Sequence, residues 1–408
     1  MNEGGDNPQK YPLEIHSQRI SVPFEYPVCF TRGVFAPDNP LLASVLDRLG
    51  EGRRHRAVVY VDAGLAAAQP GLVGRIKEYF HGRPDCLELA APPQTVPGGE
   101  AAKTAWDAVR DVMWTLGNLH LDRQSYVVAV GGGAVLDMLG FATSIVHRGL
   151  RLVRLPTTTL AQDDAGVGVK NGMDEHGQKN FVGTFAPPFS VVNDFDFLRT
   201  LPFEHWIGGV AEALKVAIIK DGGFFEFLRT RAAALRGRDE AAMAEAVRRC
   251  ALLHLEHTRE GGDPFEFGSA RPLDFGHWAG HRIELLSEFA VGHGQATAVG
   301  IALDSYYARQ TGLISAEELE TILAALVETG LPIWSEHLQQ RRGDGQLAIL
   351  EGLDHFREHL GGALTITLPR GIGSRCEVHR VSAEIVEQGV RFLRDRARTA
   401  EAAREDPG

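Results

Sequence analysis

The segment 126–137 constrains the fold of this chain more than any other part of the sequence. An unbroken apolar run, Tyr126 to Val130, leads directly into Gly131, Gly132 and Gly133. Such a run predicts a strand buried on both faces, as in a parallel sheet, and the glycines predict a tight turn into a helix. The free N–H groups at that helix N-terminus suit a phosphate or a dinucleotide. The motif is not GxGxxG, and a strand–helix turn without a ligand is the alternative.

Strands and helices alternate in the first half of the chain. Apolar patterns predict strands at 57–62 and 86–89 and helices near 39–49, 70–80 and 100–119. This alternation predicts a parallel sheet covered by helices on both faces. Beyond Pro202, apolar residues recur at helical spacing as far as about residue 330. We therefore expect an α/β domain over 1–203 and a mostly α-helical domain over 204–408.

Charge and cysteine content disfavour several classes of protein. The 53 acidic residues outnumber the 42 Lys and Arg residues, and the net charge of −11 disfavours nucleic acid and anionic membranes as partners. The four cysteines form no CxxC pair, which fits a reducing cytosol better than a disulfide framework or a cysteine zinc site. The N-terminal residues carry no secretory pattern, and the most apolar stretch contains Asp137 and three glycines. We expect a soluble cytoplasmic protein.

Two glycine-containing loops in the first half are rich in polar side chains. Their candidate binding residues are Thr157, Thr158, Asp164, Lys170, Lys179 and Asn180. Hydroxyls, acids and lysines in this mixture suit a phosphate or a polyol, although a lysine alone is most simply a solvated surface charge.

Three further polar residues lie at the ends of predicted elements. Asp62 ends a predicted strand, where an acid suits ribose hydroxyls, and a helix cap or a solvated loop acid is the alternative. Glu100 and Lys103 follow Pro97-Gly98-Gly99 at the start of a predicted helix. Taken alone, they indicate no more than a capped surface helix.

The helical half contains the strongest chemical signal. His277 and His281 are spaced i, i+4 on one helix face, and His293 follows between two glycines. Glu212 and Lys215 are spaced i, i+3 on another predicted helix. Imidazoles and a carboxylate with an open position are typical of catalytic zinc. The alternative is that these are packed or surface histidines in a chain that has 16 of them.

Taken together, these segments resemble the sugar-phosphate cyclase superfamily, whose best-known members are the 3-dehydroquinate synthases. The motifs GGGxxxD, PTT, DxxxxxK, KN, AExxK, HxxxH and HG occur in the family's order, within about residues 57–375. The resemblance implies an α/β, Rossmann-like NAD-binding domain joined to a mostly α-helical metal-binding domain, usually in a homodimer.

The resemblance also implies roles for individual residues. It implies that Glu212, His277 and His293 bind Zn²⁺, with Co²⁺ as the other candidate. The positions implied to bind NAD are Asp62, Glu100, Lys103, Gly131, Gly132, Gly133, Asp137, Thr157, Thr158, Asp164, Lys170, Lys179, Thr200 and Leu201. The positions implied to bind substrate or act in catalysis are Asp164, Lys170, Lys179, Asn180, Lys215 and His281. Arg148 matches an arginine that reaches the phosphate of the neighbouring subunit, and Arg357 or His359 loosely matches a lysine pair.

The implied reaction converts a small sugar phosphate into a carbocycle. A ring carbinol is oxidised by NAD⁺, and the resulting ketone acidifies the adjacent C–H. Phosphate then leaves by β-elimination, the ketone is reduced again, and ring opening followed by an intramolecular aldol step closes the carbocycle. Zinc would polarise the ring hydroxyls, and His281 would move protons.

Departures from the quinate pattern bear on the substrate. Asp274 stands where those enzymes usually carry Asn, and Ala270 stands where they carry an arginine. Arg271 is displaced by one residue after an apparent insertion, and Val169 replaces a usual glycine. A weakened arginine clamp and an added acid disfavour a carboxylated heptulosonate. This favours sedoheptulose 7-phosphate and a synthase of the 2-epi-valiolone type.

Three other interpretations remain open at this point. A 3-dehydroquinate synthase would use Arg271 as its carboxylate clamp. A metal-dependent polyol or glycerol dehydrogenase shares a similar glycine turn but would release NADH. The third is a catalytically inactive binding protein, which is disfavoured because all of the candidate metal-binding and phosphate-binding residues are present in one chain.

Overall fold

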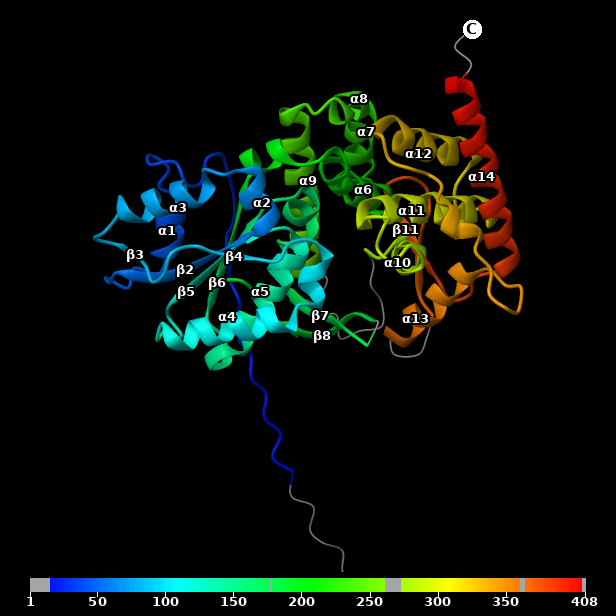
Figure 1. Ribbon diagram of the computed structural model, residues 1–408. Helices are drawn as coiled ribbons and strands as arrows, with labels where there is room; N and C mark the ends of the chain where they lie inside the picture. The colour runs from blue at the N-terminus through cyan, green and yellow to red at the C-terminus, as the bar shows by residue number, and fades with distance from the viewer. Residues whose placement is uncertain (1–14, 177, 261–272, 360–363, 406–408) are drawn as a thin grey trace, which may run out of the picture.

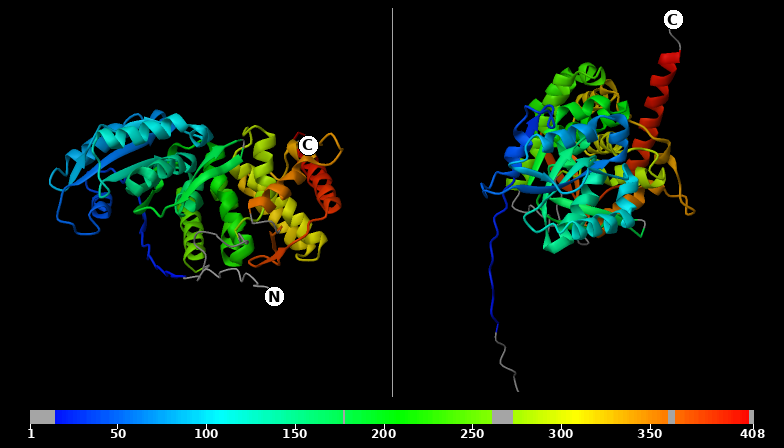
Figure 2. Two further views of the ribbon diagram at one scale, coloured as in Figure 1. Left: turned by 90° about the horizontal axis from the view of Figure 1, so that it is seen from below. Right: turned by 60° about the vertical axis from the view of Figure 1, so that its left-hand side comes forward.

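The computed structural model describes residues 15–176, 178–260, 273–359 and 364–405. Its two halves lie side by side, with the strands gathered in the first half and most of the long helices in the second (Figures 1 and 2). The chain leaves the first half at its N-terminal side as an extended segment that exposes Ile20, Val22 and Phe24.

The first half is built on one parallel sheet. Its strands run in the order β1-β9-β6-β5-β2-β3, and β4 also pairs with β2. Their bounds are Val28–Thr31 (β1), His55–Asp62 (β2), Leu87–Leu89 (β3), Gln94–Val96 (β4), Tyr126–Gly131 (β5), Arg151–Pro156 (β6) and Ser190–Asp194 (β9). All of the pairings in this sheet are parallel, as the sequence predicted.

Helices cover both faces of this sheet because successive side chains of a strand point to opposite faces. In β2, Ala57, Val59 and Val61 pack with the cluster that includes α1 and α3, whereas Val58 and Tyr60 pack with α4 and α5. The helices are Leu41–Leu46 (α1), Ala63–Ala68 (α2), Leu72–His81 (α3), Trp106–Asn118 (α4) and Gly133–Ile145 (α5). The single helix predicted over 100–119 is instead a 3₁₀ turn, Glu100–Thr104, followed by α4.

An antiparallel hairpin, Lys170–Glu175 (β7) and Gln178–Phe185 (β8), projects from the first half. It is separate from the parallel sheet and carries Lys170, Lys179 and Asn180. In the ribbon diagram it lies at the side of the sheet that faces the helical half (Figures 1 and 2).

The second half is mostly helical and has its own apolar core. Its helices are Phe203–Lys220 (α6), Gly222–Thr230 (α7), Ala232–Arg236 (α8), Glu240–Glu260 (α9), His277–Leu286 (α10), His293–Gln310 (α11), Ala316–Thr329 (α12), Glu351–His359 (α13) and Ala383–Glu405 (α14). One short antiparallel pair, Ile366–Pro369 (β10) and Arg375–Val378 (β11), packs among them.

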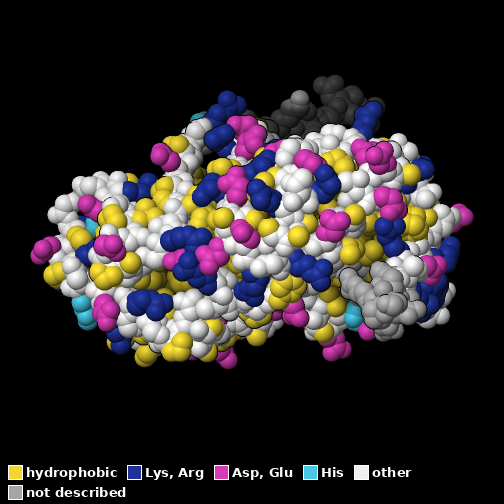
Figure 3. Space-filling model, turned by 90° about the horizontal axis from the view of Figure 1, so that it is seen from above, with side chains coloured by type: hydrophobic (Ala, Val, Ile, Leu, Met, Phe, Trp, Pro, Cys, Tyr) yellow, Lys and Arg dark blue, Asp and Glu magenta, His cyan; other side chains and the backbone are white. Residues whose placement is uncertain are grey.

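Acidic and basic side chains alternate over the face shown in Figure 3, and no basic stripe of the kind that binds nucleic acid is seen there. None of the described helices combines the length and the hydropathy that crossing a membrane requires.

Candidate metal and cofactor site

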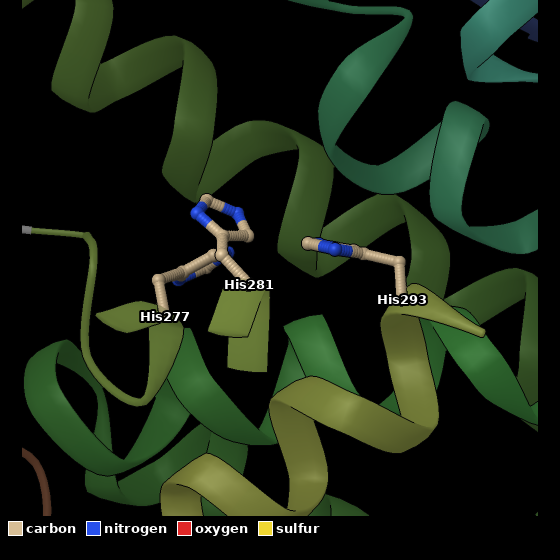
Figure 4. A group of neighbouring side chains, drawn as sticks. All are labelled: His277, His281 and His293. Carbon is tan, nitrogen blue, oxygen red and sulfur yellow. The ribbon is translucent and has the colours of Figure 1, made fainter. Parts of the chain in front are cut away.

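Three helices of the second half bring a carboxylate and three imidazoles together. Glu212 lies in the middle of α6, His277 begins α10, His293 begins α11, and His281 is one turn along α10. The three imidazoles point toward one another (Figure 4), with ring centroids 5.1–5.6 Å apart. The sequence patterns had placed Glu212 and the histidines on separate predicted helices, and the fold joins them in one cluster.

A left-handed residue sets the direction in which α10 starts. Gly276 has φ of +78° immediately before His277. A Cβ there would lie 2.8 Å from the backbone N of Ile301, so no other residue fits without displacing α11. The backbone N–H of Gly276 and the indole N–H of Trp278 both donate to Asp304, which fixes this turn against α11.

The donor atoms fit a metal of the zinc class. Glu212 is fully buried, and its Oε1 lies 3.5 Å from Nε2 of His277 and 3.5 Å from Nε2 of His293. In a tetrahedral site with bonds of about 2.0–2.1 Å, neighbouring ligand atoms stand about 3.3 Å apart. Neither carboxylate oxygen of Glu212 makes a regular hydrogen bond in the described structure. Two imidazoles and one carboxylate leave a position open for substrate.

Lys215 lies against this carboxylate from the next turn of α6. Its Nζ contacts Oε2 of Glu212 as a buried ion pair. Burial opposes the charged form of Glu212, but Lys215 and the imidazole of His277 hold the pKa of its carboxyl well below the usual value. Burial alone would lower the pKa of Lys215, and Glu212 and Asp164 raise it. The site therefore presents a carboxylate and an ammonium side by side.

His281 and His293 differ in the direction of their pKa shifts. Burial lowers the pKa of His281 to about 3, although Glu284 acts in the opposite direction. Its imidazole is therefore neutral near pH 7 and can accept a proton. Burial also opposes protonation of His293, but Glu284 and Glu212 raise the pKa of His293 to about 10. The pKa values of these two imidazoles are thus shifted in opposite directions.

Glu284 belongs to this cluster, although the motifs did not single it out. It is 1% exposed, and its Oε2 lies 3.2 Å from Nδ1 of His293. Its Oε1 lies 2.7 Å from Nζ of Lys179 on β8. The signal was present in the sequence, because residues 277, 281 and 284 share one helix face at i, i+4 and i+7.

The glycine turn of the first half carries a second network. Gly132 caps α5, and a Cβ on it would lie 3.3 Å from Cγ2 of Thr158. Asp137, one turn into α5, contacts Nζ of Lys103, which also donates to Oδ1 of Asn180 at 2.5 Å. Lys103 is 6% exposed, so the interpretation of its segment as a plain surface helix is wrong.

Two other residues implied to bind NAD border the same end of the sheet. Asp62 accepts from the backbone N of Leu65 at 3.1 Å and so caps α2. Thr200 accepts from Gln69 at 3.1 Å and, with it, lines a cavity of about 460 Å³ at the carboxyl ends of β1 and β9. Ligands of open α/β sheets bind at this carboxyl end, although the residues that line the cavity do not include the glycine turn.

The loop before the hairpin brings Asp164 toward the metal cluster. Oδ1 of Asp164 lies 3.1 Å from Nδ1 of His254 on α9, and the ligand atoms of Asp164, His254 and Glu212 lie within 4.8 Å of one another. Arg154 is fully buried on β6 and donates to the backbone carbonyls of Gly166, Gly168 and Lys170. No motif pointed to His254 or Arg154, and the contact of His254 with Asp164 joins segments 90 residues apart in sequence.

The remaining predicted site residues lie elsewhere. Arg148 is exposed beyond the end of α5, and Arg357 makes an exposed ion pair with Asp354. Asp274 lies near enough to Lys215 to help raise its pKa. Arg271 and the side chain of His359 lie outside the described residues.

Comparison with known proteins places this arrangement in a family. Residues 93–208 match the model of the 3-dehydroquinate synthase N-terminal domain, and residues 209–347 match that of its C-terminal domain. The 3-dehydroquinate synthase of Xylella fastidiosa (strain M12) is 32% identical over 387 residues, covering 92% of this chain and 98% of the relative. The 2-epi-valiolone synthase of Actinosynnema mirum is 33% identical over 351 residues, covering 84% and 87%.

A solved structure shows the same fold. ValA, the 2-epi-5-epi-valiolone synthase of Streptomyces hygroscopicus subsp. jinggangensis 5008, was solved with NAD⁺ and Zn²⁺ bound. It matches with a TM-score of 0.81 at 28% identity, over 93% of this chain and all of that one. From the two matched models and the near full-length relatives, this chain belongs to the 3-dehydroquinate synthase family of sugar-phosphate cyclases.

Proposed function

We propose that this chain is an NAD- and zinc-dependent cyclase that converts sedoheptulose 7-phosphate into a carbocycle of the 2-epi-valiolone type. The observation that carries the proposal is the buried cluster of Glu212, His277 and His293, with neutral His281 and charged Lys215 beside it. When bound, NAD⁺ removes and returns a hydride, and zinc polarises the ring hydroxyls.

The chain's own residues position the substrate and move protons. Neutral His281 accepts a proton from the substrate and returns it later in the cycle. Lys215 holds a positive charge next to the ring oxygens and stabilises negative charge that develops there. Lys179 and Asn180 grip the phosphate or its flanking hydroxyls, with Lys170 and Asp164 on the same side.

The choice of sedoheptulose 7-phosphate rests on charge. Asp274 contributes a negative charge close to Lys215, at the position where quinate synthases usually carry Asn. An acid there repels a substrate carboxylate and accepts hydrogen bonds from hydroxyls. The match to a 2-epi-valiolone synthase supports the same substrate class.

Three less direct features complete the proposal. We place the domain boundary at residue 203, where α6 begins, and the reaction in the cytoplasm. We also propose a homodimer in which exposed Arg148 reaches the phosphate bound by the neighbouring subunit.

The test offers two phosphates side by side to the purified protein with NAD⁺ and Zn²⁺. We expect inorganic phosphate from sedoheptulose 7-phosphate, with no net NADH, and little from 3-deoxy-arabino-heptulosonate 7-phosphate. Product NMR then identifies the epimer. Phosphate from the heptulosonate alone would make the chain a 3-dehydroquinate synthase, and net NADH without phosphate would make it a polyol dehydrogenase.

A variant sharpens the substrate assignment. Asp274→Asn removes the negative charge, so we expect the ratio of kcat/KM values to shift toward the heptulosonate. Asp354→Asn, which alters an exposed acid on α13, is the matched control and should leave the ratio unchanged. An unchanged ratio in Asp274→Asn would remove this acid from substrate selection.

A further inference from the structure

Glu284 contacts both an expected metal ligand and the hairpin. Its Oε2 lies 3.2 Å from Nδ1 of His293, and its Oε1 lies 2.7 Å from Nζ of Lys179. His293 begins α11 in the helical half, whereas Lys179 lies on β8, which belongs to the first half. A single carboxylate therefore joins two parts of the molecule that are 114 residues apart in sequence, as 293 − 179 shows.

The surroundings of Lys179 favour this one position of its ammonium. The ammonium lies 3.9 Å from Glu100 and 5.2 Å from the ring centroid of Phe289. Burial alone would lower the pKa of Lys179, but Glu284 and Glu100 raise it. Separating a buried carboxylate from one of its charged partners is strongly destabilising, so Glu284 keeps Lys179 and His293 together.

The contact with His293 also determines which ring nitrogen is available. A carboxylate that accepts from Nδ1–H leaves the lone pair of Nε2 free, and Nε2 is the atom that faces Oε1 of Glu212. Carboxylates in this position orient metal-binding histidines and raise their basicity. Glu284 thus fixes His293 for metal binding with one oxygen while the other oxygen holds the hairpin.

We propose that Glu284 is a positioning residue that couples zinc occupancy to the position of the β7–β8 hairpin. Zinc fixes His293, His293 orients Glu284, and Glu284 holds Lys179 and with it the hairpin strand. Because such coupling is reciprocal, a hairpin held in place also strengthens zinc binding. The coupling rests on the zinc site proposed above, and it adds that the effect of zinc extends from the ligands to the β7–β8 hairpin.

The first experiment compares Glu284→Gln with the full-length wild type and with Glu351→Gln. Glu351 pairs with Arg282, which lies on a different face of α10 from Glu284. No ion pair joins Glu351 to an expected metal ligand in the described structure, so Glu351→Gln is a matched control for the change of acid to amide. Zinc affinity is measured by competition with a chromophoric chelator. We expect Glu284→Gln to bind zinc about 10- to 100-fold more weakly and Glu351→Gln to match the wild type.

The second experiment measures amide hydrogen exchange with and without zinc. In the wild type we expect zinc to slow exchange in residues 170–175 and 178–185, and in Glu284→Gln we expect this zinc effect to vanish even at saturating zinc. Exchange in α6 reports whether each variant is folded. Lys179→Met provides an independent route, because it should abolish the zinc effect on the hairpin while lowering zinc affinity less than Glu284→Gln does.

The outcomes separate this coupling from the proposed function. If the wild type binds zinc but its hairpin exchanges equally fast with and without the metal, the coupling is wrong and the zinc site stands. The same conclusion follows if Lys179→Met keeps the zinc effect. If the wild type binds no zinc at all, the proposed metal site fails, and the coupling fails with it.

Discussion

The glycine turn after β5 and the imidazole cluster of α10 and α11 differ in what supplies their binding groups. At the turn, the backbone N–H groups of consecutive residues would bind the expected anion, and the glycines add no side chain that would block its approach. In the cluster, one carboxylate and three imidazoles come from three helices. The turn needs only its own segment to be formed, whereas the cluster requires the whole helical half to be packed.

Close helix contacts provide that packing. A Cβ on Gly294 would lie 2.5 Å from Cα of Gly208, so α11 and α6 touch directly beside His293 and Glu212. A Cβ on Gly300 would lie 2.0 Å from the carbonyl oxygen of Gly276, so α11 also touches the start of α10. The geometry of the metal cluster therefore depends on how closely α6, α10 and α11 pack. Binding at the glycine turn depends on the volume of the side chains at the turn itself.

Removing the shared carboxylate should produce the largest effect. Glu212→Gln deletes the expected ligand charge and removes the ion-pair partner of buried Lys215, at a cost of about 3–5 kcal/mol. We expect zinc to be absent by elemental analysis after dialysis and the melting temperature to fall. Glu226→Gln, which alters an exposed ion pair on α7, should keep both at the wild-type level. Full zinc content in Glu212→Gln would refute the ligand assignment.

Loss of His281 should separate metal binding from proton transfer. In His281→Ala the contacts of Glu212 with His277 and His293 remain, so zinc should be retained. Turnover should fall about 10²- to 10⁴-fold, the usual contribution of a positioned acid or base. Zinc content and phosphate release are measured on the same sample, with His81→Ala, at the exposed end of α3, as the control. Wild-type turnover would remove His281 from the mechanism.

The same contrast explains how much of the molecule could be predicted from sequence. The parallel sheet followed from unbroken apolar strands, and the pairing of His277 with His281 followed from helical spacing. Each of these depends on one continuous segment. The helix limits were less accurate, because the 3₁₀ turn at 100–104 interrupts a helical pattern that looks continuous.

Contacts between distant segments could not be read in this way. Glu284 meets Lys179 and His254 meets Asp164 only after the halves of the chain have packed together. Helical periodicity placed Glu284 on the right face, but it gave no reason to choose it over any other buried acid. The segment of Lys103, taken alone, indicated a surface helix for a related reason, since its partners Asp137 and Asn180 lie 34 and 77 residues away.

A methyl group at the glycine turn tests the other half of the comparison. In Gly132→Ala the added Cβ would lie 3.3 Å from Thr158 and fill the space in front of the α5 N–H groups. We expect NAD⁺ affinity, measured by calorimetry, to fall about tenfold, or about 1.4 kcal/mol, with the fold and the zinc content retained.

Gly117→Ala is the matched control for this change. A Cβ there meets nothing within 4 Å, and the residue lies in α4 away from the turn. It should leave NAD⁺ affinity unchanged and stabilise the helix by about 0.5–1 kcal/mol. Equal NAD⁺ affinity in Gly132→Ala and Gly117→Ala would mean that the cofactor does not approach this backbone.

The last prediction concerns the pH dependence of stability in the helical half. Burial raises the pKa of Asp304 to about 7, although hydrogen bonds from Trp278 and Gly276 lower it. The folded state therefore holds this proton between about pH 4 and pH 7, where the unfolded chain releases it. This contribution to stability is complete below pH 4 and is lost as the pH rises to 7, by at most about 1.4 kcal/mol per pH unit.

Asp304→Asn removes the titrating group and keeps the size of the side chain. Urea unfolding of both proteins at pH 4 to 8 gives two free energies of unfolding, and their difference isolates Asp304 because every other group titrates in both. We expect the wild type to lose stability relative to the variant as the pH rises to 7, and the difference to be constant above pH 8. A difference that does not change with pH would mean that Asp304 is already ionised at pH 4. The turn before His277 would then be held by a charged carboxylate that accepts from the N–H groups of Gly276 and Trp278.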